Sequence, residues 1–312
     1  MLEKPPINSN ESDLAKGLAE FRQGRKSLLP EFELPTDDIK KEEIEIVPER
    51  LMAYSLEKLL GELNLDTKLK DPKFLEILAS TIGSYFKADT VSPWYEFHTL
   101  DAIYFLGIKL PGLSYDDLDS KINQSGFLAK LAEHLKHDIK ESSENAMSAA
   151  FLCWGISTIN FLEIKIPGLD PNELNLIINN PDRLKQLFEY LDDELELGKV
   201  DPNSATLACK TLSAIHSLGI KLPELNYEDQ DSKLCDPELL KQLFSQINDD
   251  LTINHSKGSD LAWACQVLFS IKNLIKYYSA IADEKEATLA AHRLQTAANR
   301  TGVPPRPETK AF

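Results

Sequence analysis

Residues 106–113 read LGIKLPGL, and the phrase returns as LEIKIPGL at 162–169 and as LGIKLPEL at 218–225. Both intervals are 56 residues. Self-similarity at a fixed long period is typical of proteins built from stacked helical repeats. The phrase is therefore either a ligand-binding motif used three times or a boundary inside a repeated structure.

The 56-residue register extends beyond the phrase without a gap. RLKQLF at 183–188 becomes LLKQLF at 239–244, and isoleucine recurs at 103, 159, 215 and 271. Each copy is predicted to hold an apolar helix A before the phrase, a connector after it, and an amphipathic helix B. We predict an all-α protein, a right-handed α-solenoid of about four 56-residue helical-hairpin repeats with capping helices. The predicted helices are 49–60, 72–86, 94–106, 125–140, 144–162, 181–197, 203–218, 236–251 and 259–281, then a terminal helix.

The phrase itself is interpreted as the end of helix A. Gly107 and Gly219 stand where a left-handed C-cap is expected, and the proline at 111, 167 and 223 prevents the helix from resuming. In the middle copy Glu163 replaces the glycine, so a strict left-handed cap is doubtful there. A phosphate-cradling loop needs more glycine and a helix that starts directly after it. The phrase is therefore predicted to be a structural boundary.

Composition divides the chain into three parts. Residues 1–48 are polar, acidic and proline-containing, and we predict a disordered N-terminal arm. Residues 49–300 are predicted to form the α-helical repeat domain, beginning with a degenerate copy, and residues 301–312 a flexible tail. No apolar run reaches the roughly 18–20 residues of a membrane span, and the polar start has no signal-peptide core. We therefore expect a cytoplasmic protein that does not contact membranes.

The charge balance points to a protein partner. The chain has 34 Lys and Arg against 50 Asp and Glu, a net charge of -16. Nucleic-acid binding needs clustered basic residues, so it is not expected, whereas a partner with a basic surface is favoured. The four cysteines show no CxxC spacing, which indicates reduced thiols in a cytosol.

Two groups of residues, one of histidines and one of cysteines, are of the types that bind metal ions. His134 and His137 stand three apart on helix B, but no third ligand follows at a usable spacing, so a solvated face is expected. Cys153, Cys209 and Cys265 recur at the 56-residue interval. Packed helices lie about 10 Å apart, which is too far for a disulfide. We predict small buried residues and no metal.

A group of carboxylates ends helix B and is expected to be solvated. Its members are Asp192, Asp193, Glu194, Asp249 and Asp250. Paired carboxylates can act as acid and base, but no GxSxG, Walker, HExxH or GxGxxG pattern accompanies them. We therefore expect neither a catalytic site nor a cofactor.

One face of helix A changes from copy to copy. Leu100, Ile103 and Leu106 have apolar counterparts in the later copies, so their side is expected to be buried. Positions 98, 101 and 105 share another face because they are three and four residues apart. The residues at these positions and their counterparts are His98, Asp101, Phe105, Trp154, Ser157, Phe161, Lys210, Ser213, Ser217, Gln266, Phe269 and Asn273.

Two interpretations of this variable face remain open. In the first, the face packs on a neighbouring helix B with relaxed tolerance. In the second, it lines the concave groove of the solenoid and binds a partner protein, with Trp154 and Phe161 as aromatic anchors.

Segments of helix A resemble known repeat families. TLSAIHSLGI at 211–220 and FLCWGISTINFLEI at 151–164 resemble the helices of octotricopeptide and FAST-type repeats, in which a helix rich in small residues ends in Leu-Gly. This resemblance covers roughly residues 50–280 and implies a helical-hairpin solenoid, an architecture that tetratricopeptide repeats share. The octotricopeptide and FAST-type families often bind RNA, so RNA binding is the alternative function.

The whole chain also resembles type IV secreted effectors of Legionella-like bacteria. The features that it shares with them are acidic helical repeats, a polar start and the short tail ETKAF. That resemblance implies secretion into a host cytosol without a signal peptide, and in the metaeffectors it implies regulation of another effector by binding. Solenoids present extended surfaces suited to such binding. Our leading prediction is a non-catalytic protein-binding scaffold that regulates a partner protein.

Overall fold

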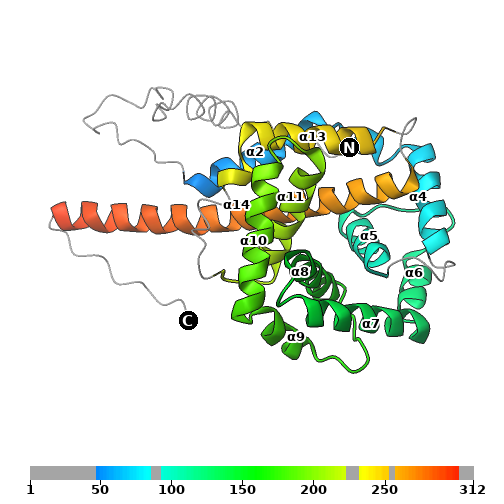
Figure 1. The fold of residues 1–312 in the computed structure, drawn as a ribbon. Coiled ribbons are helices and arrows are strands. Elements are labelled where there is room, and N and C mark those ends of the chain that lie inside the picture. The colour runs from blue at the N-terminus through cyan, green and yellow to red at the C-terminus, as the bar shows by residue number, and fades with distance from the viewer. Residues whose placement is uncertain (1–46, 86–92, 223–231, 253–256, 302–312) are drawn as a thin grey trace, which may run out of the picture. The chain divides into compact units, whose positions relative to one another are not determined.

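Every regular element in the described part of the chain is a helix (Figure 1). The structure is a computed structural model that describes residues 47–85, 93–222, 232–252 and 257–301. The predicted all-α class is confirmed for these residues. The predicted arm up to residue 46 and the predicted tail from residue 302 lie outside them.

The helices of the described residues follow the predicted pattern. They are α2 (Pro48–Glu62), α3 (Leu65–Lys68), α4 (Pro72–Tyr85), α5 (Pro93–Leu106), α6 (Tyr115–Ile122), α7 (Ser125–Glu141), α8 (Ala146–Phe161), α9 (Pro171–Ile178), α10 (Pro181–Leu197), α11 (Pro202–Ser217), α13 (Pro237–Asp250) and α14 (Gly258–Thr301). All predicted boundaries before 281 lie within two residues of these ends. Helix α14 continues past the predicted end at 281 because no glycine or proline follows until Gly302.

The chain divides into two compact units, residues 1–54 with 278–312 and residues 55–277. In the first unit, ion pairs join the first turn of α2 to the second half of α14. Arg50 contacts Asp283 and Glu286, and Lys285 contacts Glu49. All the residues of the variable face belong to the second unit. The predicted repeat domain, residues 49–300, lies mostly in the second unit, but its residues 49–54 and 278–300 belong to the first.

Helix positions repeat at the interval seen in the sequence. Helices α7, α10 and α13 begin at residues 125, 181 and 237, and these are the predicted helices B. The predicted helices A are α5, α8, α11 and the first half of α14. Helices α6 and α9 begin at 115 and 171 and lie in the connectors.

The repeated phrase ends α5, α8 and α11 in the same way. Gly107 and Gly219 have φ angles of 65° and 62°, and both positive values suit glycine. The amide of the next residue, Ile108 or Ile220, donates to the carbonyl five residues earlier at 3.0 and 3.1 Å. This bond is the mark of a Schellman motif, so the predicted boundary is confirmed.

The middle copy ends in the same conformation despite its glutamate. Glu163 has a φ of 52°, so the doubt about a left-handed cap there was wrong. The amide of the buried Ile164 donates to the Ile159 carbonyl at 3.1 Å. A left-handed non-glycine residue costs roughly 1–2 kcal/mol, and the burial of Ile164 with its Schellman bond offsets that strain.

Helices α5, α8, α11 and residues 258–277 of α14 contact one another in sequence, and we call them the inner-helix circuit. Polar contacts across each successive pair join residues that are 57 and 60 apart. These pairs are Asp101–Thr158 and His98–Thr158, then Trp154–Thr211 and Ser157–Ser217, then Thr206–Trp263 and Ser213–Asn273. The recurring offsets mean that each inner helix packs on the next in the same register.

Helix α14 also contacts α5, which closes the circuit. Gln266 Nε2 donates to Thr99 Oγ1 at 2.9 Å, and the rings of Phe269 and Phe105 meet edge to face at 4.9 Å. In an open solenoid each copy contacts only its neighbours. The prediction of a right-handed solenoid with a concave groove did not include contacts between α5 and α14. The periodicity defines neighbours along the chain and carries no signal that α5 and α14 meet.

Candidate functional site inside the inner-helix circuit

The residues of the variable face lie on the four inner helices and contact one another. Phe105 contacts Phe161 and Phe269, and Lys210 contacts Trp154 and Gln266. His98 and Asp101 contact Thr158 of α8, and Phe105 contacts Phe161 of the same helix, so positions 98, 101 and 105 share one face as predicted. The interpretation that this face packs on a helix B is wrong for most of them, because their contacts lie on other inner helices. Among them Trp154 also contacts Tyr190 of α10, a helix B.

Lys210 lies between two tryptophan rings in the middle of the circuit. Its Nζ is 4.4 Å from the centroid of Trp154 and 4.2 Å from that of Trp263. Nζ also donates to Gln266 Oε1 at 2.7 Å. A lysine is rarely buried as deeply as Lys210, which is 6% exposed. Cation–π contacts of a desolvated ammonium contribute about 2 kcal/mol, so the two indoles and the amide compensate for its lost hydration.

Three titratable groups share this buried space. Burial lowers the pKa of Lys210 to about 7, while the charge of Asp101 acts in the opposite direction. Burial raises the pKa of Asp101 to about 8, and the hydrogen bond from Thr158 and the charge of Lys210 partly counteract it. Burial also lowers the pKa of His98 well below its ordinary value, so His98 is neutral. The indole faces and the Gln266 carbonyl oxygen favour the ammonium form of Lys210.

A small cavity of about 20 Å³ adjoins these groups and is lined by Asp101, Ser157, Lys210 and Phe269 among others. Asp101 Oδ2 accepts from Thr158 at 3.1 Å, and Oδ1 has no hydrogen-bond partner in the described part of the chain. A lysine and a carboxyl group with shifted pKa values are typical of reactive sites. The volume, however, holds about one water molecule. An organic substrate therefore has no room beside the pair.

Aromatic rings close both ends of the circuit. At the end where α5 and α8 terminate, Phe105, Phe161 and Phe269 pack edge to face with centroids 4.9–5.9 Å apart. We call these three residues the phenylalanine end. Toward the opposite end, Tyr95 stacks on Trp263.

The two predicted aromatic anchors differ in accessibility. Phe161 is 44% exposed and can meet a partner. Trp154 is 5% exposed, and its indole N–H donates to Thr211 at 3.2 Å. Trp154 is therefore part of the packed interior, and its assignment as an accessible anchor was wrong. The reason is that neighbouring helices cover the middle of α8, whereas Phe161 lies in its exposed last turn.

The candidate metal ligands lie where the sequence predicted. His134 and His137 are exposed on α7, and Cys153, Cys209 and Cys265 are buried free thiols. Burial raises the pKa of each of these thiols. Within the described ranges no group of three His, Cys, Asp or Glu side chains is placed to hold a metal ion. Over the same ranges, no helix combines the length and the apolar character needed to cross a membrane.

The carboxylates at the end of helix B differ from the prediction of a solvated group. Asp193 and Asp249 are exposed, but Asp250 is 9% exposed and accepts a hydrogen bond from Gln246 at 2.8 Å. Burial raises the pKa of Asp250 to about 6 and also raises that of Glu194. The prediction was wrong for Asp250 and Glu194, because the end of helix B packs beside other helices instead of projecting into solvent.

Several residues of the site were missed by sequence reasoning. Thr99 and Thr158 lie beside the predicted positions and supply hydroxyl groups to Gln266 and Asp101. Trp263 provides the second indole beside Lys210. We call the three residues around the Lys210 ammonium group, Trp154, Trp263 and Gln266, the lysine cage. A threonine inside an apolar helix is the available signal, because a buried hydroxyl needs a hydrogen-bond partner.

Comparisons of the chain with protein-family models, with curated proteins and with solved structures gave no match. The resemblances to repeat families and to secreted effectors therefore stay predictions.

Proposed function

We propose that the chain is a non-catalytic protein built from four 56-residue helical repeats, and that it regulates a partner protein by direct binding at the phenylalanine end. The observation that carries this proposal is Phe161, whose ring is 44% exposed while its edges meet Phe105 and Phe269. A ring already held by its neighbours loses little freedom when a partner covers it. Buried aromatic residues contribute strongly to protein interfaces.

The charge of the chain supports a partner with basic residues. The connectors that follow the inner helices, 107–123, 163–179 and 219–235, hold three acidic and two basic residues, three and one, and four and two, respectively. Arg and Lys are attracted both to such acidic segments and to the faces of aromatic rings. We therefore expect the partner to present apolar and basic side chains together.

RNA binding, which is the alternative function, and the resemblance to metaeffectors lead to different expectations for the partner. RNA bases can stack on aromatic rings, but RNA binding also needs a basic surface along the backbone path, and the net charge is -16. A metaeffector acts by binding another effector, which agrees with a protein partner.

The test compares two phenylalanines on the same helix. The partner is first captured from native lysate and identified by mass spectrometry, and its affinity for the purified chain is then measured by calorimetry. Phe161→Ala is expected to weaken binding about 30-fold, because truncating an interface aromatic commonly costs about 2 kcal/mol. The control is Phe151→Ala, since Phe151 is 37% exposed near the start of α8. Equal affinities of wild type and Phe161→Ala, or tight binding of RNA, would overturn the proposal.

A further inference from the structure

The first and third connectors carry the same short segment. Asp-Ser-Lys occupies residues 119–121 and again 231–233, two periods of 56 later. The residue after it is apolar and buried in both, Ile122 and Leu234. Lys121 and Lys233 are therefore counterparts, and their surroundings can be compared directly.

In the third copy the lysine is held by two carboxylates of α10. Lys233 Nζ lies 2.6 Å from Asp192 Oδ1 and 3.4 Å from Glu196 Oε1. Asp192 follows Leu191 and Glu196 follows Leu195, and both leucines are fully buried. The two carboxylates thus occupy the positions on helix B directly after two successive core residues.

In the copy that contains Lys121, the corresponding positions on α4 carry no carboxylate. Two periods of 56 before Asp192 and Glu196 stand Ser80 and Ser84 of α4, and their neighbours Ala79 and Gly83 are also small. Where α10 provides two carboxylates, α4 provides two hydroxyl groups. Space is expected beside Lys121 for this reason.

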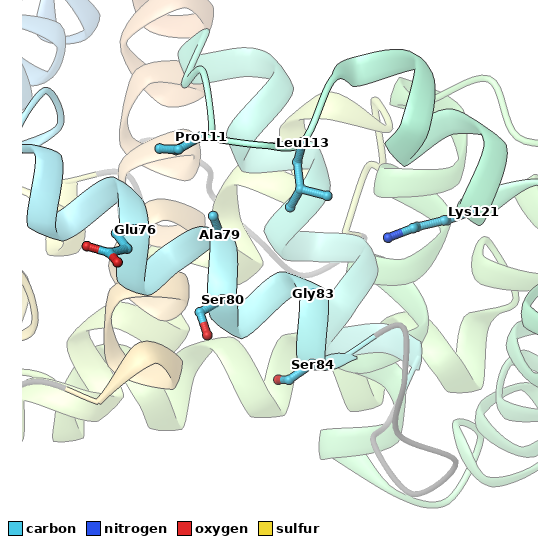
Figure 2. A pocket seen from close by; sticks show the side chains of 8 residues that line it. All are labelled: Glu76, Ala79, Ser80, Gly83, Ser84, Pro111, Leu113 and Lys121. Carbon is cyan, nitrogen blue, oxygen red and sulfur yellow. The ribbon is translucent and has the colours of Figure 1, made fainter.

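The structure has a cavity at this place. Its volume is about 520 Å³, and its lining is Glu76, Ala79, Ser80, Gly83, Ser84, Pro111, Leu113 and Lys121 (Figure 2). Ligand pockets commonly measure about 300–1,000 Å³. Figure 2 shows Glu76 and Lys121 at opposite ends of the lining, with the small residues of α4 between them and Leu113 above.

We propose that this pocket binds a short peptide segment that has a carboxylate at one end and a basic group at the other. The carboxylate meets Lys121 in the way that Asp192 and Glu196 meet Lys233, and the basic group meets Glu76. A lysine ammonium has three donors, and Lys233 contacts two carboxylates at once, so the site does not require Lys121 to be without other contacts. Pro111 and Leu113 provide an apolar wall for the middle of the peptide.

The chemistry of the occupant follows from the charges of the whole chain and of the pocket. A chain of net charge -16 repels free anions, whereas a peptide with equal numbers of positive and negative charges carries no net charge. The small side chains of α4 let a peptide backbone approach closely, and the hydroxyl groups of Ser80 and Ser84 can bond to it. This site is separate from the phenylalanine end and does not depend on the proposed function.

The test is a titration of the full chain with the tripeptide Lys-Ala-Glu, followed through the amide resonances of α4 and α6. We expect saturable shifts in the wild type and at least a tenfold loss of affinity in Lys121→Gln. Lys109→Gln is the matched control, because Lys109 is an exposed lysine of the same loop region outside the lining, and it is expected to bind like the wild type.

A second variant places a carboxylate on α4, where α10 has its own. A side chain at residue 83 meets no atom within 4 Å at its Cβ position, so Gly83→Glu can fold while placing a carboxylate near Lys121. Gly83→Glu is expected to lower the affinity for the tripeptide at least tenfold. An absence of saturable shifts in the wild type would overturn the proposal, as would wild-type binding by Gly83→Glu. If Lys-Ala-Gln amide bound as tightly as Lys-Ala-Glu, the pocket would not recognise a carboxylate. If glutarate bound as tightly as Lys-Ala-Glu, the pocket would not be specific for a peptide.

Discussion

The middle of the inner-helix circuit and its phenylalanine end are built from the same three positions of each repeat, yet they differ in accessibility. In the middle, Trp154 and Lys210 are 5% and 6% exposed and bond to neighbouring helices. At the end, Phe161 is 44% exposed. Variation between copies therefore marks the positions that face the inside of the circuit. Only the last turn of that face is open to a partner, so sequence variation alone does not identify a binding surface.

The largest expected effect is a difference in stability between variants of the two regions. Trp154→Ala is expected to lower the free energy of unfolding by about 3–5 kcal/mol, the usual loss for a large buried aromatic. Phe161→Ala is expected to lower it by less than about 1.5 kcal/mol, because nearly half of its ring already contacts solvent. Denaturant unfolding measures both. Equal losses would show that the two regions are not distinguished by burial.

The lysine cage gives the next effect. Lys210→Ala removes two cation–π contacts and the hydrogen bond to Gln266 and opens a void between two indole rings, so a loss of about 3 kcal/mol is expected. The matched control is Lys221→Ala, since Lys221 is exposed in the third copy of the phrase, and a change within about 0.5 kcal/mol is expected there. A Lys210→Ala protein as stable as the control would contradict the cage as an element of the core.

Burial of Asp101 predicts a pH dependence that is specific to the middle of the circuit. Its pKa is raised from 3.8 to about 8, so between these values the folded state binds more protons than the unfolded state, and stability falls as pH rises. Asp101→Asn lacks this proton. From pH 4.5 to 6.5 the wild type is expected to lose stability relative to Asp101→Asn by up to about 1.4 kcal/mol per pH unit. A difference that stays constant with pH would show that Asp101 is ionised in the folded protein.

The smallest expected effect concerns association with the partner. Charges of opposite sign accelerate association, and salt screens them. With a basic partner, the association rate is expected to fall several-fold between about 50 and 500 mM salt, whereas Phe161→Ala is expected to act mainly on dissociation. Stopped-flow kinetics at two salt concentrations measures both rates. An association rate independent of salt would show that electrostatic attraction does not accelerate binding to the partner.

The sequence predicted the elements of this fold better than their assembly. The helix of residues 181–197 was predicted at its observed ends, because Pro181 and the stripe of leucines after it are local signals. Closure between Phe105 and Phe269 was not predicted, since it joins residues 164 positions apart and has no periodic signature. Lys210 was assigned to a binding surface because its position varies from copy to copy. Its burial depends on three partners from two other helices, Trp154, Trp263 and Gln266.

Closure of the inner-helix circuit is the central claim, and a double-mutant cycle between Phe105 and Phe269 tests it most directly. Unfolding of wild type, Phe105→Leu, Phe269→Leu and the double variant gives the coupling energy of the pair. The contact between their rings at 4.9 Å predicts a coupling of about 0.5–1.5 kcal/mol. Phe151 and Phe269, toward opposite ends of the circuit, are expected to be additive. Additive effects of Phe105→Leu and Phe269→Leu would contradict the closed circuit and favour an open row of helices.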